Sequence, residues 1–124
     1  MSGNRLLLDT NAILGFLTDA RYKSAFDKKS LFASTITELE LLSFHSLRDD
    51  ELDKINIFFG FCEIIELTQS IKSKTVELRK KYKLKLPDSI ICATVVTHNL
   101  VLVSADKQLQ KIKELRVITI DDLL

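Results

Sequence analysis

Four acidic side chains occupy positions from which they can act on one common group. Asp9 comes directly after a short apolar run, and Asp106 comes three residues after another. Glu40 lies in a helix-like stretch that follows a third apolar run, and Asp88 opens a second such stretch. Since reactive groups in open α/β sheets gather outside the carboxyl ends of the strands, we expect these four acids to converge at one edge of a sheet.

Clustered carboxylates of this kind predict a divalent cation. Like charges held close together raise each other's pKa unless a cation neutralises them. Hard, oxygen-seeking Mg²⁺ or Mn²⁺ is the natural partner of an all-carboxylate site. Such a site suits hydrolysis of a phosphodiester bond, because a bound cation activates water and stabilises the charge on the phosphate and on the leaving oxygen.

The choice between Glu38 and Glu40 depends on where their helix begins. The two residues are two positions apart, so they point in substantially different directions and only one should face the site. A helix that starts at Thr35 makes Thr35-Ile-Thr-Glu38 a capping box, which gives Glu38 a structural task and leaves Glu40 for the metal site. A start at Thr37 reverses the assignment. We favour Glu40.

Each acid also has a purely structural interpretation. Asp9 can end a strand in an Asx-turn, while Asp88 and Asp106 can each favour the dipole of the helix that they begin. Their joint placement at one edge favours the functional interpretation. No motif places His45 or His98, and we expect helix-surface or helix-end positions for both.

The elements that must position these acids alternate between short apolar runs and helix-like stretches. The pairs are 6–8 with 10–17, 31–33 with 35–44, 62–67 with 69–82 and 100–103 with 105–113, and the run 117–120 comes last. Two further helix-like stretches are 49–61 and 87–99. This alternation predicts an α/β fold with a central, mostly parallel five-stranded sheet and helices on both faces.

Composition limits the remaining possibilities. The 124 residues suit a single domain spanning 1–124, and a net charge of +1 gives no global attraction for nucleic acid. Cys62 and Cys92 lie in apolar runs typical of reduced core thiols. Three leucines after Arg5 are too few for a signal peptide or a membrane span, so we expect a soluble cytoplasmic protein.

One local stretch is strongly basic and leads directly into Asp88. Against the single acid Glu77 it carries Lys72, Lys74, Arg79, Lys80, Lys81, Lys83 and Lys85. A basic ridge beside an acidic site would hold phosphates that the carboxylates alone repel, and Arg79 and Lys85 are the preferred contacts. The alternative is an ordinary solvated helix face.

Four motifs in order resemble the PIN-domain nucleases, and in particular the small toxins of the VapBC toxin–antitoxin type. The resemblance covers nearly the whole chain. The motifs are Leu-Leu-Leu-Asp9-Thr10-Asn11, Ser34-Thr-Ile-Thr37-Glu-Leu-Glu40, Leu86-Pro-Asp88-Ser and Leu102-Val-Ser104-Ala-Asp106.

This resemblance implies a PIN-like three-layer α/β/α sandwich and an Mg²⁺- or Mn²⁺-dependent endoribonuclease. Asp9, Asp88 and Asp106 would hold the cation, and Glu40 would orient or deprotonate the attacking water. Supporting polar groups would come from Thr10, Asn11 and Ser104. Where many relatives have Asp followed by Phe, this chain has Gln108 and Leu109, so we expect one well-held metal ion and leave a second open.

The resemblance also implies protein partners. Toxins of this type have a cognate antitoxin and usually pair as homodimers. The stretch 55–61 carries more aromatic surface than one helix face easily buries, and Ile13, Phe16 and Leu17 add another apolar face. An apolar groove between these helices would suit an amphipathic antitoxin segment or a second protomer.

Three other classes of protein fit part of the pattern. A haloacid-dehalogenase-type phosphatase needs a second Asp where this chain has Asn11, and a receiver-type domain needs an Asp after the third strand, where Thr68 follows the third apolar run. A PIN-like fold kept as a non-catalytic interaction module is the third. The intact acids argue against it.

Overall fold

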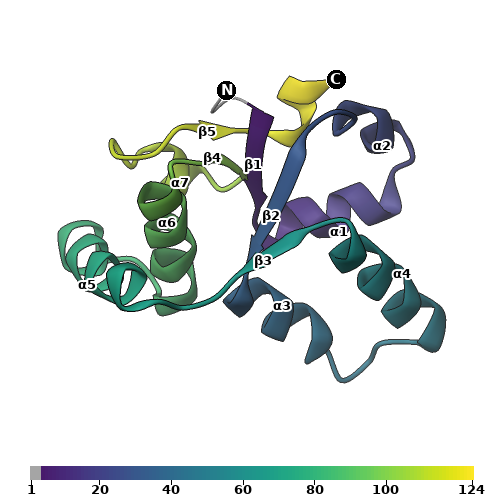
Figure 1. Ribbon diagram of the computed structural model, residues 1–124, viewed down its shortest axis with the longest axis horizontal. Helices are drawn as coiled ribbons and strands as arrows, with labels where there is room; N and C mark the ends of the chain where they lie inside the picture. The colour runs from purple at the N-terminus through teal and green to yellow at the C-terminus, as the bar shows by residue number, and fades with distance from the viewer. Residues whose placement is uncertain (1–3) are drawn as a thin grey trace.

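The computed structural model describes residues 4–124, which form an α/β fold around one parallel sheet (Figure 1). All four pairings between neighbouring strands are parallel, in the order β3-β2-β1-β4-β5. The strand order reverses at β1, so the carboxyl ends of β1 and β4 adjoin at the place where open α/β sheets carry their sites. The strands are β1 (Arg5–Leu8), β2 (Ser30–Ser34), β3 (Glu63–Ile65), β4 (Val101–Val103) and β5 (Val117–Ile118).

Alternate side chains of the central strands enter two separate apolar clusters, because successive residues of a strand point to opposite faces of a sheet. Leu7 and its register partner Leu102 lie in one cluster, whereas Leu6 and Leu8 lie in the other. All four leucines are fully buried. The unbroken apolar run of β1 is therefore explained by a strand that is covered on both faces.

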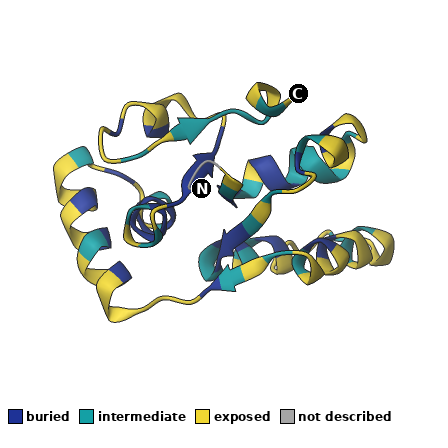
Figure 2. Ribbon diagram, turned by 45° about the horizontal axis from the view of Figure 1, so that its top comes forward, coloured by how far each residue is buried: buried dark blue, intermediate teal, exposed yellow. Residues whose placement is uncertain are grey.

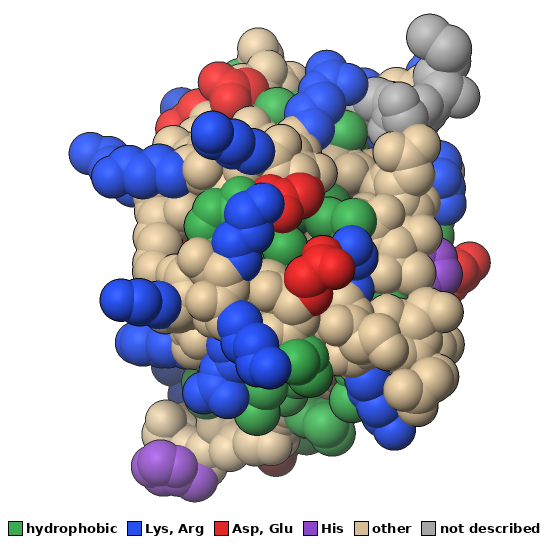
Figure 3. All heavy atoms as spheres, turned by 90° about the vertical axis from the view of Figure 1, so that its left-hand side faces the viewer, with side chains coloured by type: hydrophobic (Ala, Val, Ile, Leu, Met, Phe, Trp, Pro, Cys, Tyr) green, Lys and Arg blue, Asp and Glu red, His purple; other side chains and the backbone are tan. Residues whose placement is uncertain are grey.

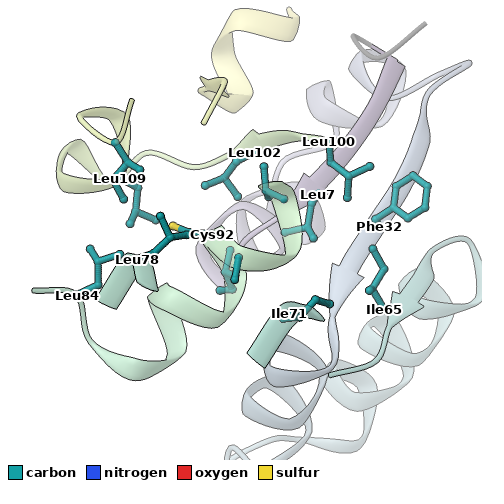
Figure 4. Close-up of a cluster of buried hydrophobic side chains, with 14 residues drawn as sticks. Leu7, Phe32, Ile65, Ile71, Leu78, Leu84, Cys92, Leu100, Leu102 and Leu109 are labelled. Atoms are coloured by element: carbon teal, nitrogen blue, oxygen red, sulfur yellow. The ribbon is translucent and has the colours of Figure 1, made fainter. Parts of the chain in front are cut away.

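Helices cover both faces of the sheet, which confirms the predicted three-layer α/β/α arrangement. Ile71, Leu78, Cys92 and Leu109 pack on one face beside Leu102 (Figure 4). The helices on that face are α5 (Gln69–Tyr82), α6 (Leu86–His98) and α7 (Lys107–Gln110). Those that contribute to the other cluster are α1 (Thr10–Thr18), α2 (Arg21–Ala25), α3 (Thr35–Leu42) and α4 (Asp49–Gly60).

Buried residues concentrate in the central strands and on the inner faces of the helices (Figure 2). Cys62 and Cys92 are free thiols, as predicted, and burial raises the pKa of each to about 12. Within residues 4–124, no helix combines the length and the apolar character that crossing a membrane requires.

Three predicted elements are wrong in extent, and two helices, α2 (Arg21–Ala25) and a 3₁₀ helix near the C-terminus, were not predicted. The stretch 105–113 is helical only in α7, since Asp106 caps that helix and fixes its start at Lys107. The run 117–120 is a strand only over β5, because the Thr119 hydroxyl accepts from the Asp122 N–H and starts the 3₁₀ helix η2 (Ile120–Leu123). The run 62–67 pairs only over β3.

Candidate active site at the carboxyl edge of the sheet

Two of the four acids follow neighbouring strands. The Asp9 N–H donates to the Val103 carbonyl at 3.2 Å, so Asp9 stands where the β1–β4 pairing ends. Asp106 follows β4 after a short turn in which its own N–H donates to the Ser104 hydroxyl at 3.1 Å. The predicted convergence of these two carboxylates thus follows from the register of two parallel strands.

Asp9 is a buried carboxylate that also caps helix α1. Its Oδ1 accepts a hydrogen bond from the Ala12 N–H at 2.8 Å. Burial raises the pKa of Asp9, the Ser104 hydroxyl and the Ala12 N–H oppose that rise, and the charge of Asp106 adds to it. The capping interpretation and the site interpretation are compatible, because the cap occupies only one carboxylate oxygen.

Asp106, like Asp9, both caps a helix and is a candidate for the site, and the helix that it caps is α7. Its Oδ1 accepts from the Gln108 N–H at 2.8 Å, and its side chain is exposed. The helix dipole and this hydrogen bond give Asp106 a structural task, as one interpretation of the sequence predicted. Its second oxygen is not used by the cap.

Asp88 lies on helix α6, at the same edge of the sheet. It lies in the first turn of that helix and is half-buried. Burial raises its pKa, as does the charge of Asp106, while Lys85 lowers it; Asp9 and Glu40 raise it further. The charges of the three other acids therefore all act on Asp88, and we refer to these four residues as the carboxylate cluster.

Glu40 is the glutamate of α3 that reaches this cluster. Its Oε1 accepts a hydrogen bond from the Thr10 hydroxyl at 2.9 Å, which joins α3 to the first residue of α1. The predicted capping box of Thr35 and Glu38 is wrong, because Ser34 is the N-cap residue and its hydroxyl accepts from the Ile36 N–H. The preference for Glu40 agrees with this contact, although the capping argument behind it does not hold.

The donor set of the cluster fits a hard divalent cation. It consists of carboxylate oxygens alone, and within residues 4–124 none of the four acids takes part in an ion pair. No group of three or more His, Cys, Asp or Glu side chains in that part of the chain already stands in position to hold a metal ion. Binding a cation therefore needs side-chain movement, for which the exposed Asp106 and the half-buried Asp88 have room.

The supporting polar residues differ in how closely they are tied to the acids. Thr10 contacts Glu40 directly, and Ser104 contacts both Asp106 and Asp9. Asn11 is exposed in the first turn of α1. The sequence did not reveal which acid Thr10 holds, because that contact joins residues 30 positions apart.

The two predicted phosphate contacts lie on different parts of the basic stretch. Lys85 is the N-cap residue of α6, three positions before Asp88, and its charge acts on that carboxylate. The Arg79 Nε donates to the Leu84 carbonyl at 3.2 Å, so this side chain holds the turn between α5 and α6. On the face that carries α5, Lys and Arg side chains clearly outnumber acidic ones (Figure 3).

An apolar groove lies apart from the acidic cluster, where the sequence predicted one. It has a volume of about 600 Å³ and is lined mainly by α1 and α4. Ile57 and Phe61 are 62 % and 78 % exposed there, and Lys23 and Lys54 stand among the apolar lining residues. Of the residues in the predicted apolar face, Phe16 and Leu17 line the groove, whereas Ile13 is fully buried in the core.

Residues 6–115 match the family model of the PIN domain, and the chain belongs to the PIN domain family. A toxin–antitoxin complex from Klebsiella pneumoniae includes a chain that is 30% identical with a TM-score of 0.77, covering 93% of this chain and 97% of that one. A search of the curated proteins finds no match.

Two more distant solved structures share the fold. One is the crystal structure of VapBC2 from Rickettsia felis bound to a DNA fragment from the VapBC2 promoter. A chain of that structure is 21% identical with a TM-score of 0.79, covering 93% of this chain and 98% of that one. A chain of VapBC-1 from nontypeable Haemophilus influenzae is 20% identical with a TM-score of 0.78, covering 94% and 98%.

Proposed function

We propose that this chain is a divalent-metal-dependent endoribonuclease and the toxin of a type II toxin–antitoxin pair. The observation that carries the nuclease proposal is the cluster of Asp9, Glu40, Asp88 and Asp106, in which the charges of the other three acids act on Asp88 and that of Lys85 opposes them. The toxin proposal is supported by family membership and by the similarity to a chain of a toxin–antitoxin complex.

In this proposal Asp9, Asp88 and Asp106 hold the Mg²⁺ or Mn²⁺ ion, directly or through water. The ion supplies Lewis acidity and lowers the pKa of bound water, which is what phosphodiester hydrolysis requires. Asp9 is buried and held by its capping hydrogen bond, so little of its side-chain freedom remains to be lost on binding, whereas Asp88 and Asp106 move to reach the ion. Gln108 leaves no further carboxylate at its position, and we therefore propose one metal ion.

Glu40 is proposed to orient or deprotonate the attacking water. The Thr10 hydroxyl donates to one of its oxygens and leaves the other as an acceptor. No covalent intermediate is needed. Lys85, whose charge acts on Asp88, is proposed to attract a phosphate there, and Arg79 is proposed as a second contact that gives affinity without reading sequence.

Removing divalent metal tests the proposal. We expect the purified chain to cleave single-stranded or structured RNA in Mn²⁺ or Mg²⁺, and to lose at least about 100-fold in rate in chelator because the ion supplies several kcal/mol. Adding the ion back should restore cleavage, measured on labelled RNA in a gel assay. Cleavage that continues unchanged in chelator would contradict the proposal, and equal cleavage of the matching DNA would contradict its substrate class.

Glu40→Gln and Glu38→Gln form a matched pair on one helix. Glu40→Gln keeps the length of the side chain but removes the charge and the basicity, so we expect a loss of about 10²–10⁴-fold in the cleavage rate. Glu38→Gln should retain the wild-type rate, since the contact with Thr10 and the charge that raises the pKa of Asp88 both belong to Glu40. Equal losses in the two variants would show that Glu40 has no special role.

The apolar groove is proposed to receive an amphipathic segment of the antitoxin. Exposed Ile57 and Phe61 supply apolar contacts, and Lys23 and Lys54 favour acidic residues at the edges of the bound segment. We expect Phe61→Ser to weaken binding of a cognate antitoxin by at least about tenfold, measured by calorimetry. Val76→Ser, which changes an exposed apolar residue of α5 outside the groove, should not. Equal effects of the two variants would argue against the groove.

A homodimer is the second proposed assembly. Leu39, Leu42 and Phe44 are exposed apolar residues on and just after α3, and none of them lines the groove. A second copy of the chain is proposed to cover them. Light scattering should give twice the mass of the chain, and a monomer at micromolar concentration would contradict this assembly.

A further inference from the structure

One buried hydroxyl in the interior has no hydrogen-bond partner. Thr37 is 0 % exposed, and its Oγ1 is the only buried side-chain nitrogen or oxygen atom without a partner among residues 4–124. A buried polar atom that makes no hydrogen bond costs stability, so each such atom in a folded protein requires an explanation. The sequence pattern alone assigns Thr37 no role of its own.

Two other buried threonines show how this chain normally satisfies a helical hydroxyl. Thr75 Oγ1 donates to the Ile71 carbonyl and Thr94 Oγ1 donates to the Ile90 carbonyl, both at 2.7 Å and both four residues back. Thr37 is the third residue of α3, so the residue four positions back is Ala33, which belongs to strand β2. The backbone is not helical there, which explains why the usual acceptor is missing.

Thr37 lies on the same side of helix α3 as Glu40. Successive helical residues are rotated by about 100°, so Glu40 and Thr37 lie between Ile36 and Leu41 in angular order around the helix. Ile36 packs against the cluster on one face of the sheet, and Leu41 lies in the cluster on the other. The sector between them therefore faces the carboxyl edge of the sheet, where Glu40 contacts Thr10.

We propose that Thr37 is a positioning residue of the metal site. When the carboxylate side chains move to bind the cation, the Thr37 hydroxyl becomes accessible to a water molecule at the floor of the carboxylate cluster and hydrogen-bonds it, and that water belongs to the hydration shell of the divalent cation. Mg²⁺ keeps several of its waters in protein sites, and hydrogen-bonding groups beyond the direct ligands tune metal affinity. This inference rests on the proposed function, since it concerns the same cation.

Thr37→Val and Thr37→Ser test the inference, with Thr94→Val as the control. Valine keeps the shape of threonine and removes the hydroxyl. In chelator, Thr37→Val should raise Tm by roughly 3–6 °C because it removes an unpaired buried polar atom. Calorimetric titration with Mn²⁺ should show affinity about 10–100-fold weaker in Thr37→Val, while Thr37→Ser stays close to wild type.

Thr94→Val removes a hydroxyl that already has a partner on the helix that carries Asp88. It should lower Tm or leave it unchanged, and its Mn²⁺ affinity should match wild type. If wild type binds Mn²⁺ and Thr37→Val binds it equally well, the role of Thr37 is overturned and the proposed function stands. If wild type binds no Mn²⁺, the proposed function fails and this inference fails with it.

Discussion

Asp9→Asn should abolish metal-dependent RNA cleavage while leaving the fold intact. Asparagine is as good an N-cap residue as aspartate, so the hydrogen bond from the Ala12 N–H is retained. The substitution removes one negative charge from the proposed cation site, and the cation supplies several kcal/mol to the reaction. We expect a loss of at least about 100-fold in the cleavage rate, measured with saturating Mn²⁺.

The same variant should be more stable than wild type when no cation is present. The pKa of Asp9 is raised above 3.8 in the folded chain, so stability from this group is lost as pH rises through the folded pKa. The asparagine amide does not titrate, and the difference in Tm should therefore grow in favour of Asp9→Asn between about pH 4 and pH 7 in chelator. A variant that retains wild-type cleavage would contradict the role of Asp9, whereas one that unfolds would contradict the capping argument.

Leu102→Ala should cause the largest loss of stability among the substitutions considered. Leu102 is 0 % exposed, lies in β4 between β1 and β5, and belongs to the cluster covered by α5, α6 and α7. Truncating such a leucine leaves a cavity and costs about 3–5 kcal/mol in the free energy of unfolding. In a chain of this size we expect Tm to fall by roughly 10–20 °C, measured by calorimetry or circular dichroism.

Val76→Ala is the control for that substitution. Val76 is 55 % exposed on α5, and truncation of an exposed side chain changes the free energy of unfolding by less than about 0.5 kcal/mol. Similar shifts in Tm for Leu102→Ala and Val76→Ala would show that the described core does not dominate stability.

The parts of the fold that the sequence predicts well are those set by local pattern. The apolar run of β1, the acidic start of α4 and the Pro87-Asp88 start of α6 each predict an element within a residue or two of its bounds. α7 and β5 were predicted too long and η2 was not predicted, because side-chain caps from Asp106 and Thr119 decide where the backbone turns. Those caps compete with short apolar patterns that favour longer elements.

The residues of the candidate site also differ in how far local sequence pattern predicts their positions. Asp9 and Asp106 follow strands, so the rule for carboxyl ends of parallel strands was enough to bring them together. Glu40 depended on a helix start that the capping box misplaced, and it was selected by motif spacing rather than by local physics. The contact of Thr10 with Glu40 and the unpaired hydroxyl of Thr37 arise from packing between elements distant in the chain. No local pattern contains that information.

Anomalous scattering from crystals soaked in Mn²⁺ tests most directly whether Asp9, Asp88 and Asp106 hold a divalent cation. We predict one anomalous peak at the carboxyl edge of the sheet, about 2–2.3 Å from carboxylate oxygens or one water molecule further away. Asp9→Asn crystals should lose most of that peak. A wild-type map without a peak at this edge, or with its peak elsewhere, would contradict the proposed metal site.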